Sequence, residues 1–105
     1  MKKKILITGS NGFLGQLAID RYKKDYDLVL LDLYSVDNKN FYQVNISEFD
    51  KLDEIINKEK PNIIFHFASE IFDTNNKEKI YKTNVVGSYN IYKSAVKNNI
   101  DKLIF

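Results

Sequence analysis

Residues 8–15 read Thr-Gly-Ser-Asn-Gly-Phe-Leu-Gly, and this segment constrains the fold of the chain more than any other. It directly follows Lys4–Thr8, a short run rich in β-branched residues that is typical of a buried parallel strand. From about residue 12 to 24, apolar residues recur at helical spacing, so the glycines stand where a strand turns into a helix. We expect Ser10 and Asn11 to cap this helix.

Three glycines at such a junction predict a site for the pyrophosphate of a dinucleotide. Gly9 would allow the tight turn, Gly12 the close approach of backbone to pyrophosphate, and Gly15 the packing of helix on strand. The N–H groups of Gly12, Phe13 and Leu14 would then meet the phosphates at the positive end of the helix. An ordinary glycine-rich turn is the alternative, although three of the four glycines in the chain lie here in phase. No Gly-Lys-Ser/Thr follows, which excludes a P-loop.

A carboxylate stands near the end of the second expected strand, Asp27–Leu33. Asp32 follows Gly15 by 17 positions, where dinucleotide-binding folds place an acidic residue after about 20. Such a carboxylate accepts hydrogen bonds from both ribose hydroxyls and repels a 2′-phosphate. No arginine follows nearby, so the sequence favours NAD over NADP; the alternative is an ordinary turn aspartate.

The rest of the chain continues the alternation of strands and helices. Further strands are expected at 41–46, 62–68 and 102–105, and further helices at 49–60 and 77–98. This order predicts an α/β fold over residues 1–105, a doubly wound parallel sheet of the Rossmann type with right-handed crossovers. Because a domain rarely ends where a central strand has just begun, we expect a fragment truncated at about the fifth strand; a terminal edge strand is the alternative.

Composition narrows the classes of partner and compartment. A length of 105 residues has room for one domain, and 44% hydrophobic residues suit a folded one. A net charge of +2 is too weak to indicate nucleic-acid or membrane-surface binding, and no apolar run approaches the roughly 18 residues of a membrane span. The lack of cysteine excludes a disulfide framework and a thiolate zinc site and fits a reducing compartment, so we expect a cytoplasmic protein.

The spacing Thr-Gly-x-x-Gly-x-x-Gly resembles that of the extended short-chain dehydrogenase/reductase family, which contains NAD-dependent epimerases and dehydratases of nucleotide sugars. Segments 45–47, 66–69 and 84–88 match further family motifs in order and position, so all of this chain resembles the N-terminal portion of that family. In the family the first segment contacts adenine; Asn45 stands where an aspartate is usual, although an amide can also bond the adenine edge. The backbone of the second segment lines the cofactor, and Asn84 in the third supports the nicotinamide site.

The resemblance implies an NAD-binding Rossmann domain whose substrate, a nucleotide sugar, would bind only to a complete enzyme. The implied chemistry is hydride transfer at a sugar carbon, and this part of the sequence does not separate epimerase, dehydratase and reductase. A non-catalytic dinucleotide-binding sensor or regulatory module is the alternative. No catalytic residue or metal ligand is assigned, and the candidate cofactor-binding residues are Gly9, Asn11, Gly12, Phe13, Leu14, Gly15, Asp32, Asn45, Ile46, Phe67, Ala68, Ser69 and Asn84.

The family's catalytic serine or threonine and its Tyr-x-x-x-Lys pair are expected after the end of this sequence, so the chain alone is expected to be inactive. Tyr89 and Lys93 share that spacing, but they precede the fifth strand, where the resemblance places no catalytic pair. His66, the only histidine, is expected to be structural. Glu70 and Asp73 lie in a loop that should border the substrate, although loop carboxylates are more often simply solvated.

The expected helix at 77–98 is apolar on two sides, which indicates burial on both. One side should cover the sheet, and close packing should explain Gly87 inside the helix. Relatives in the resembled family often use the other side to form a homodimer, and left uncovered it is an association hazard. The apolar stripe consists of Tyr81, Val85, Tyr89, Tyr92 and Val96, whereas Ile80, Ile91 and Ala95 lie off it.

Overall fold

The computed structural model of the chain describes residues 2–34, 40–69 and 76–105. Within these ranges one parallel sheet has the strand order β3-β2-β1-β4-β5. Because β1 is central and the order runs outward from it in both directions, the sheet has a topological switch point between β1 and β4. The strands are β1 (Lys4–Thr8), β2 (Asp27–Asp32), β3 (Phe41–Gln43), β4 (Ile63–His66) and β5 (Lys102–Ile104).

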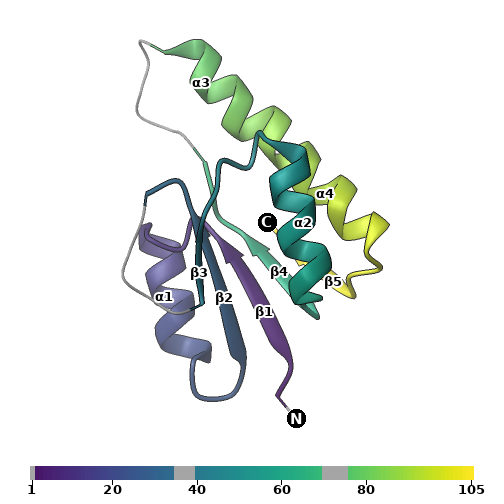
Figure 1. Cartoon of the computed structure of the whole chain (residues 1–105). Helices are drawn as coiled ribbons and strands as arrows, with labels where there is room; N and C mark the ends of the chain where they lie inside the picture. Colours follow the sequence, from purple (N-terminus) through teal and green to yellow (C-terminus); the bar gives the residue numbers. More distant parts are fainter. Residues whose placement is uncertain (1, 35–39, 70–75) are drawn as a thin grey trace.

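Helices cover both faces of the sheet. Helix α1 (Phe13–Tyr22) lies on one face, and α2 (Phe49–Glu59) and α4 (Ser88–Lys97) lie on the other (Figure 1). A short helix α3 (Lys77–Tyr81) and a π-helical segment η1 (Lys82–Gly87) lead into α4. The predicted doubly wound α/β fold is therefore confirmed. No helix in the described ranges is both long and apolar enough to cross a lipid bilayer.

The central strand is buried on both faces, which explains why its sequence is apolar without alternation. Ile5 and Ile7 pack with Ala18 of α1 on one face. Between them Leu6 points to the opposite face and packs in the cluster that contains Ile56 of α2. None of the three β1 side chains is more than 1% exposed, so the sheet anchors both helical layers.

Strand β3 is shorter than the strand predicted at 41–46. It pairs with β2 only as far as Gln43, which lies opposite Asp32, and β2 ends there. The last backbone hydrogen bond between this edge of the sheet and β2 is donated by the Val44 N–H to the Asp32 carbonyl over 3.0 Å. Asn45 and Ile46 lie beyond the ladder, because no strand remains for them to pair with. They are therefore free to turn across the carboxyl end of the sheet.

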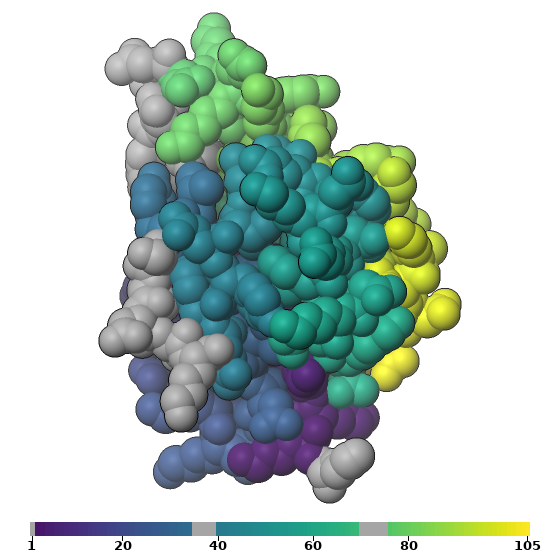
Figure 2. Space-filling view, viewed as in Figure 1, coloured from purple at the N-terminus to yellow at the C-terminus, as the bar shows by residue number. Residues whose placement is uncertain are grey.

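The predicted helix at 77–98 is helical throughout its described part, but it widens to π-helical geometry in η1. Ile91 and Ala95 of α4 are 0% and 5% exposed, which confirms that one side covers the sheet. In the space-filling view α3 projects beyond the body formed by α2 and the sheet (Figure 2). The other side is open, and each residue of the predicted stripe is more than half exposed: Tyr81, Val85, Tyr89, Tyr92 and Val96.

A buried carboxylate ties α2 to α4. Asp53 accepts hydrogen bonds from the Ser94 hydroxyl over 2.8 Å and from Asn98 Nδ2 over 3.1 Å, and it pairs with Lys97 Nζ at 2.6 Å. Burial alone would raise the pKa of Asp53, but the hydrogen bonds from Lys97, Ser94 and Asn98 outweigh it and hold the pKa below its usual value. These contacts hold α4, which directly follows η1, against α2.

Candidate functional site

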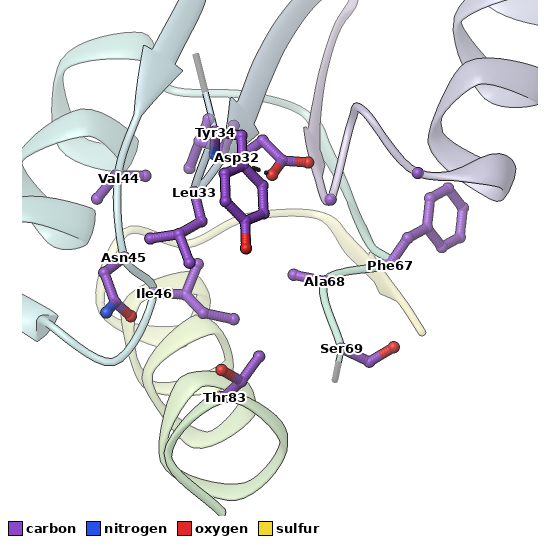
Figure 3. A pocket seen from close by; sticks show the side chains of 13 residues that line it. Asp32, Leu33, Tyr34, Val44, Asn45, Ile46, Phe67, Ala68, Ser69 and Thr83 are labelled. Carbon is purple, nitrogen blue, oxygen red and sulfur yellow. Dashed lines mark hydrogen bonds between the residues drawn. The ribbon is translucent and has the colours of Figure 1, made fainter. Parts of the chain in front are cut away.

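A cavity of about 160 Å³ opens at the carboxyl ends of β1, β2 and β4 (Figure 3). In an open α/β sheet this edge, at the switch point of strand order, is where ligands bind. The residues that line the cavity come from segments that are far apart in the sequence. The lining residues are Gly9, Gly12, Leu31, Asp32, Leu33, Tyr34, Val44, Asn45, Ile46, Phe67, Ala68, Ser69 and Thr83.

The three glycines of the loop have different structural needs. A Cβ on Gly9, whose φ is +69°, would lie 2.7 Å from the backbone nitrogen of Ala68. A Cβ on Gly15 would lie 2.4 Å from the carbonyl oxygen of Gly9, so α1 could not approach the loop. A Cβ on Gly12 would meet nothing nearer than that same oxygen, at 3.4 Å, and would otherwise point into open space. Gly9 and Gly15 are thus required for packing, whereas Gly12 leaves room above the loop.

The amino end of α1 has no side-chain cap, and the prediction that Ser10 and Asn11 cap it was wrong. The cap residue is Gly12. The Ser10 hydroxyl instead donates to the Leu31 carbonyl over 3.3 Å, and Asn11 Nδ2 donates to the Tyr34 carbonyl over 2.8 Å. Both side chains are used to join the loop to the end of β2. The first turn of α1 also has no acidic residue, so its N–H groups and positive dipole end are open to an anion.

Asp32 is held at the rim of the cavity by backbone donors. Its Oδ2 accepts from the Asn11 N–H over 2.9 Å, and its Oδ1 accepts from the Tyr34 N–H over 3.3 Å. Each carboxylate oxygen accepts more than one hydrogen bond, so the group keeps capacity for ligand hydroxyls. In Figure 3 Asp32 and Tyr34 lie at one side of the cavity, across from Ala68 and Ser69.

The wall below Asp32 is held in place by the helix that begins at η1. Ile46 is 5% exposed, and its carbonyl accepts a 2.9 Å hydrogen bond from Asn90 Nδ2. A Cβ on Gly87 would lie 2.6 Å from the Ile46 side chain, which confirms that close packing explains this helical glycine. Thr83, in the wide turn of η1, completes the wall.

A second depression of about 280 Å³ continues the site over the end of β4. It shares Phe67, Ala68 and Ser69 with the first cavity. Of the remaining predicted residues, Leu14 and Asn84 line only this depression, and Asn11, Phe13 and Gly15 line neither space. The depression is lined by Leu14, His66, Phe67, Ala68, Ser69, Asn84, Ser88 and Phe105.

Other predicted positions lie elsewhere. Tyr89 is 61% exposed and lines neither space, and Lys93 Nζ lies 4.4 Å from the ring centroid of Phe49 on the α2 side. Neither Tyr89 nor Lys93 lines the cavity or the depression. Glu70 and Asp73 lie outside the described residues.

Sequence reasoning missed several residues of the first cavity. Leu31, Leu33 and Tyr34 flank Asp32, so extending the site along the strand end would have found them. Val44 directly precedes the predicted Asn45 and Ile46. The remaining omission, Thr83, adjoins the predicted Asn84, and both belong to the π-helical segment η1. The missed residues are Leu31, Leu33, Tyr34, Val44 and Thr83.

The side chain of His66, at the end of β4, contacts Thr8 of β1 and Ser88 of α4, which fits its expected structural role. Its Nδ1 lies 2.7 Å from Thr8 Oγ1, and its Nε2 lies 2.8 Å from Ser88 Oγ. Thr8 Oγ1 already accepts the N–H groups of Phe67 and Ala68, at 3.1 and 3.2 Å, so its own proton is donated to Nδ1. His66 is then the neutral tautomer that carries its proton on Nε2 and donates it to Ser88. Burial lowers the pKa of His66 to about 4.

Because the His66 imidazole is buried and neutral, the folded chain should lose stability in acid. The imidazole takes up a proton near pH 6.5 in the unfolded chain but only near pH 4 in the folded chain. The contribution of His66 to the free energy of unfolding is therefore full above about pH 6.5 and is lost as the pH falls toward 4. Between about pH 7 and 4.5 the loss amounts to about 2 kcal/mol. Urea denaturation of the wild type and of His66→Gln at both pH values measures it. The wild type should lose about 2 kcal/mol more than the variant, and equal losses would contradict a neutral buried imidazole.

Comparisons with known proteins agree with this geometry. The family model described as the NAD dependent epimerase/dehydratase family matches residues 5–105. The chain is 35% identical to a putative UDP-glucose 4-epimerase of Methanocaldococcus jannaschii, covering 96% of this chain and 36% of that protein. It is 24% identical to an L-arabinose 1-dehydrogenase (NAD(P)(+)) of Haloferax volcanii, over 97% of this chain and 39% of that protein.

Solved structures show the same fold. The Bordetella bronchiseptica enzyme WbmG, crystallised with NAD and UDP, superposes with a TM-score of 0.89 at 23% identity, over 98% of this chain and 37% of that one. A UDP-glucose 4-epimerase of Thermotoga maritima, crystallised with UDP-glucose, gives 0.87 at 26% identity, over 97% of this chain and 37% of that one. The chain thus spans little more than a third of the length of these proteins. Since the family model matches nearly every residue, the chain belongs to the NAD-dependent epimerase/dehydratase family.

Proposed function

We propose that the chain is the NAD-binding part of an NAD-dependent epimerase or dehydratase that acts on nucleotide sugars. The observation that carries this proposal is the cavity at the switch point, where the uncapped end of α1 and the Asp32 carboxylate lie side by side. The residues fit a dinucleotide, because open space lies above Gly12 and no acidic side chain occupies the first turn of α1.

Each part of the dinucleotide has a matching part of the site. The pyrophosphate would lie over Gly12 and the first turn of α1, and Asp32 would accept the hydroxyls of the adenosine ribose. The adenine would then lie toward Asn45 and Ile46, and the nicotinamide toward the depression that contains Asn84. When bound, the nicotinamide supplies hydride chemistry, and this chain's residues bind and orient it.

The substrate class rests on relatives rather than on this site. The Thermotoga maritima neighbour holds UDP-glucose, and the Methanocaldococcus jannaschii relative is described as a putative UDP-glucose 4-epimerase. We extend this class to the longer protein, in which a nucleotide sugar would be oxidised at a sugar carbon and the hydride later returned. We place that protein in the cytoplasm, consistent with a sequence without cysteine.

Calorimetric titration with NAD and NADP tests the proposal. NAD should bind saturably and NADP at least about tenfold more weakly, because Asp32 repels a 2′-phosphate. Asp32→Asn removes the negative charge and should reduce the difference between the affinities for NAD and NADP, while the amide side chain preserves the shape of the rim. Equal affinities in the wild type would contradict the role of Asp32, and no binding of either cofactor by the folded chain would contradict the proposal itself.

A dinucleotide-binding sensor is the second candidate. A sensor needs only the dinucleotide site, whose two spaces are lined without Tyr89 or Lys93. Any sequence that continues past Phe105 separates the candidates. A serine or threonine followed by Tyr-x-x-x-Lys supports the enzyme, and a continuation without them supports the sensor.

We also propose that the open side of α4 binds a second copy of the chain. Tyr92 and its neighbours on the stripe expose apolar area that a partner helix would cover. Tyr92→Arg should shift the mass measured by sedimentation equilibrium toward the monomer. Leu17→Arg on α1 is the control, because Leu17 is 52% exposed against 55% for Tyr92. A monomeric wild type, or equal effects of both changes, would contradict this contact.

A further inference from the structure

Two backbone donors hold the Asp32 carboxylate, and each belongs to a peptide group whose other end is also held. The Asn11 N–H, which donates to Oδ2 over 2.9 Å, shares a peptide group with the Ser10 carbonyl. The Tyr34 N–H, which donates to Oδ1 over 3.3 Å, shares one with the Leu33 carbonyl. Both peptide bonds are trans. A trans peptide group is planar, and its carbonyl and N–H point in opposite directions, so a contact that fixes the carbonyl also orients the N–H.

Two glutamine side chains fix these two carbonyls. Gln16 Nε2, near the start of α1, donates to the Ser10 carbonyl over 2.9 Å. Gln43 Nε2, at the end of β3, donates to the Leu33 carbonyl over 3.1 Å. Gln43 is also the residue that lies opposite Asp32 in the ladder between β2 and β3. Each backbone donor to the carboxylate is therefore held in turn by one glutamine.

The two glutamines act on the cavity through these peptide groups and not by lining it. Neither is among the described residues that line the cavity or the depression over β4. A peptide group whose carbonyl accepts a hydrogen bond is also a stronger N–H donor, because hydrogen bonds in a chain polarise one another. The glutamines thus orient and strengthen the two donors that keep the Asp32 carboxylate at the rim beside Tyr34 (Figure 3).

We propose that Gln16 and Gln43 are positioning residues that set the preference of this site for NAD over NADP. The inference rests on the proposed function, because it requires a dinucleotide whose ribose lies at Asp32. A carboxylate that is held by two donors stays in place for the ribose hydroxyls and cannot turn away from a 2′-phosphate. Without the two glutamines, Asp32 would bind the ribose of NAD less well and would move aside for the 2′-phosphate of NADP.

Calorimetric titration of Gln16→Met, Gln43→Met and the double variant with NAD and NADP tests the inference. Methionine is unbranched like glutamine but has no amide, so it removes the hydrogen bond and adds no charge. The readout is the dissociation constant of NADP divided by that of NAD. A general loss of folded protein would weaken the binding of both cofactors equally, so this ratio separates positioning of Asp32 from a purely structural role.

The ratio should fall about threefold in each single variant and about tenfold in the double variant, the size expected for the loss of one and of two exposed hydrogen bonds. Asn57→Ala is the control, because it removes an exposed amide hydrogen bond of the same kind, from Asn57 Nδ2 to Asn98 Oδ1 over 3.0 Å. This control should leave the ratio within about 1.5-fold of the wild type.

A second measurement needs no cofactor. In NMR spectra of the free chain, Gln16→Met should shift the backbone amide resonance of Asn11 more than that of Tyr34, and Gln43→Met should do the reverse. A ratio that the double variant leaves unchanged, or shifts without this pattern, would overturn the inference while the proposed function stands. Equal affinities of the wild type for NAD and NADP would overturn the inference together with the role of Asp32. Binding of neither cofactor would overturn the inference and the proposed function.

Discussion

Gly12→Ala should weaken NAD binding at least about 100-fold while changing the free energy of unfolding by less than about 1 kcal/mol. Gly12 has extended backbone angles, φ −79° and ψ 178°, which any residue adopts. A Cβ there would meet only the Gly9 carbonyl, at 3.4 Å, so the fold tolerates it. The new methyl group would occupy the space that the pyrophosphate needs for close approach to the backbone.

Titration calorimetry with NAD and urea denaturation of the same preparation measure the two halves of this prediction. Loss of binding without loss of stability would show that the space above Gly12 is used by the ligand. If Gly12→Ala bound NAD as the wild type does, the pyrophosphate could not lie across this loop.

Gly15→Ala should have the opposite profile and destabilise the fold by about 3 kcal/mol. A Cβ at this position would lie 2.4 Å from the Gly9 carbonyl oxygen and 2.7 Å from the Cα of Ser10. These are backbone atoms of the loop, which cannot rotate away as a side chain would. Helix α1 would have to move off the sheet and lose part of its contact with Ile5 and Ile7.

The direction of this effect is unusual for a glycine inside a helix. Replacing a helical glycine by alanine ordinarily stabilises a helix by up to about 1 kcal/mol. Urea denaturation of Gly15→Ala beside Gly12→Ala therefore separates local propensity from packing, since the two glycines are three residues apart and receive the same methyl group. A stability equal to or above that of the wild type would mean that the loop and helix are not packed as described.

The parts of the fold that are fixed by local pattern could be predicted from the sequence. Lys4–Thr8 was placed correctly because a continuous apolar run of that length is buried on both faces of a parallel sheet. The glycine loop and Asp32 were placed at one site because chain direction and strand order bring the carboxyl ends of β1 and β2 together.

The parts that depend on tertiary contacts could not be predicted. Ser10 and Asn11 are good capping residues by type, but the carbonyls of Leu31 and Tyr34 compete for their side chains. Such partners, more than 20 positions away, leave no local signal in the sequence. The same is true of the π-helical segment that contains Thr83, whose last residue, Gly87, packs against Ile46.

An NMR titration of the isotope-labelled chain with NAD, followed through backbone amide shifts, tests the proposed dinucleotide site most directly. The largest shifts should fall on Gly12, Phe13, Leu14 and Ile46, whose N–H groups would border the proposed phosphate and base positions. The outer face of α4, which includes Tyr92, should stay unchanged. Shifts confined to that face, or no shifts at saturating NAD, would contradict the assignment of the cavity as a dinucleotide site.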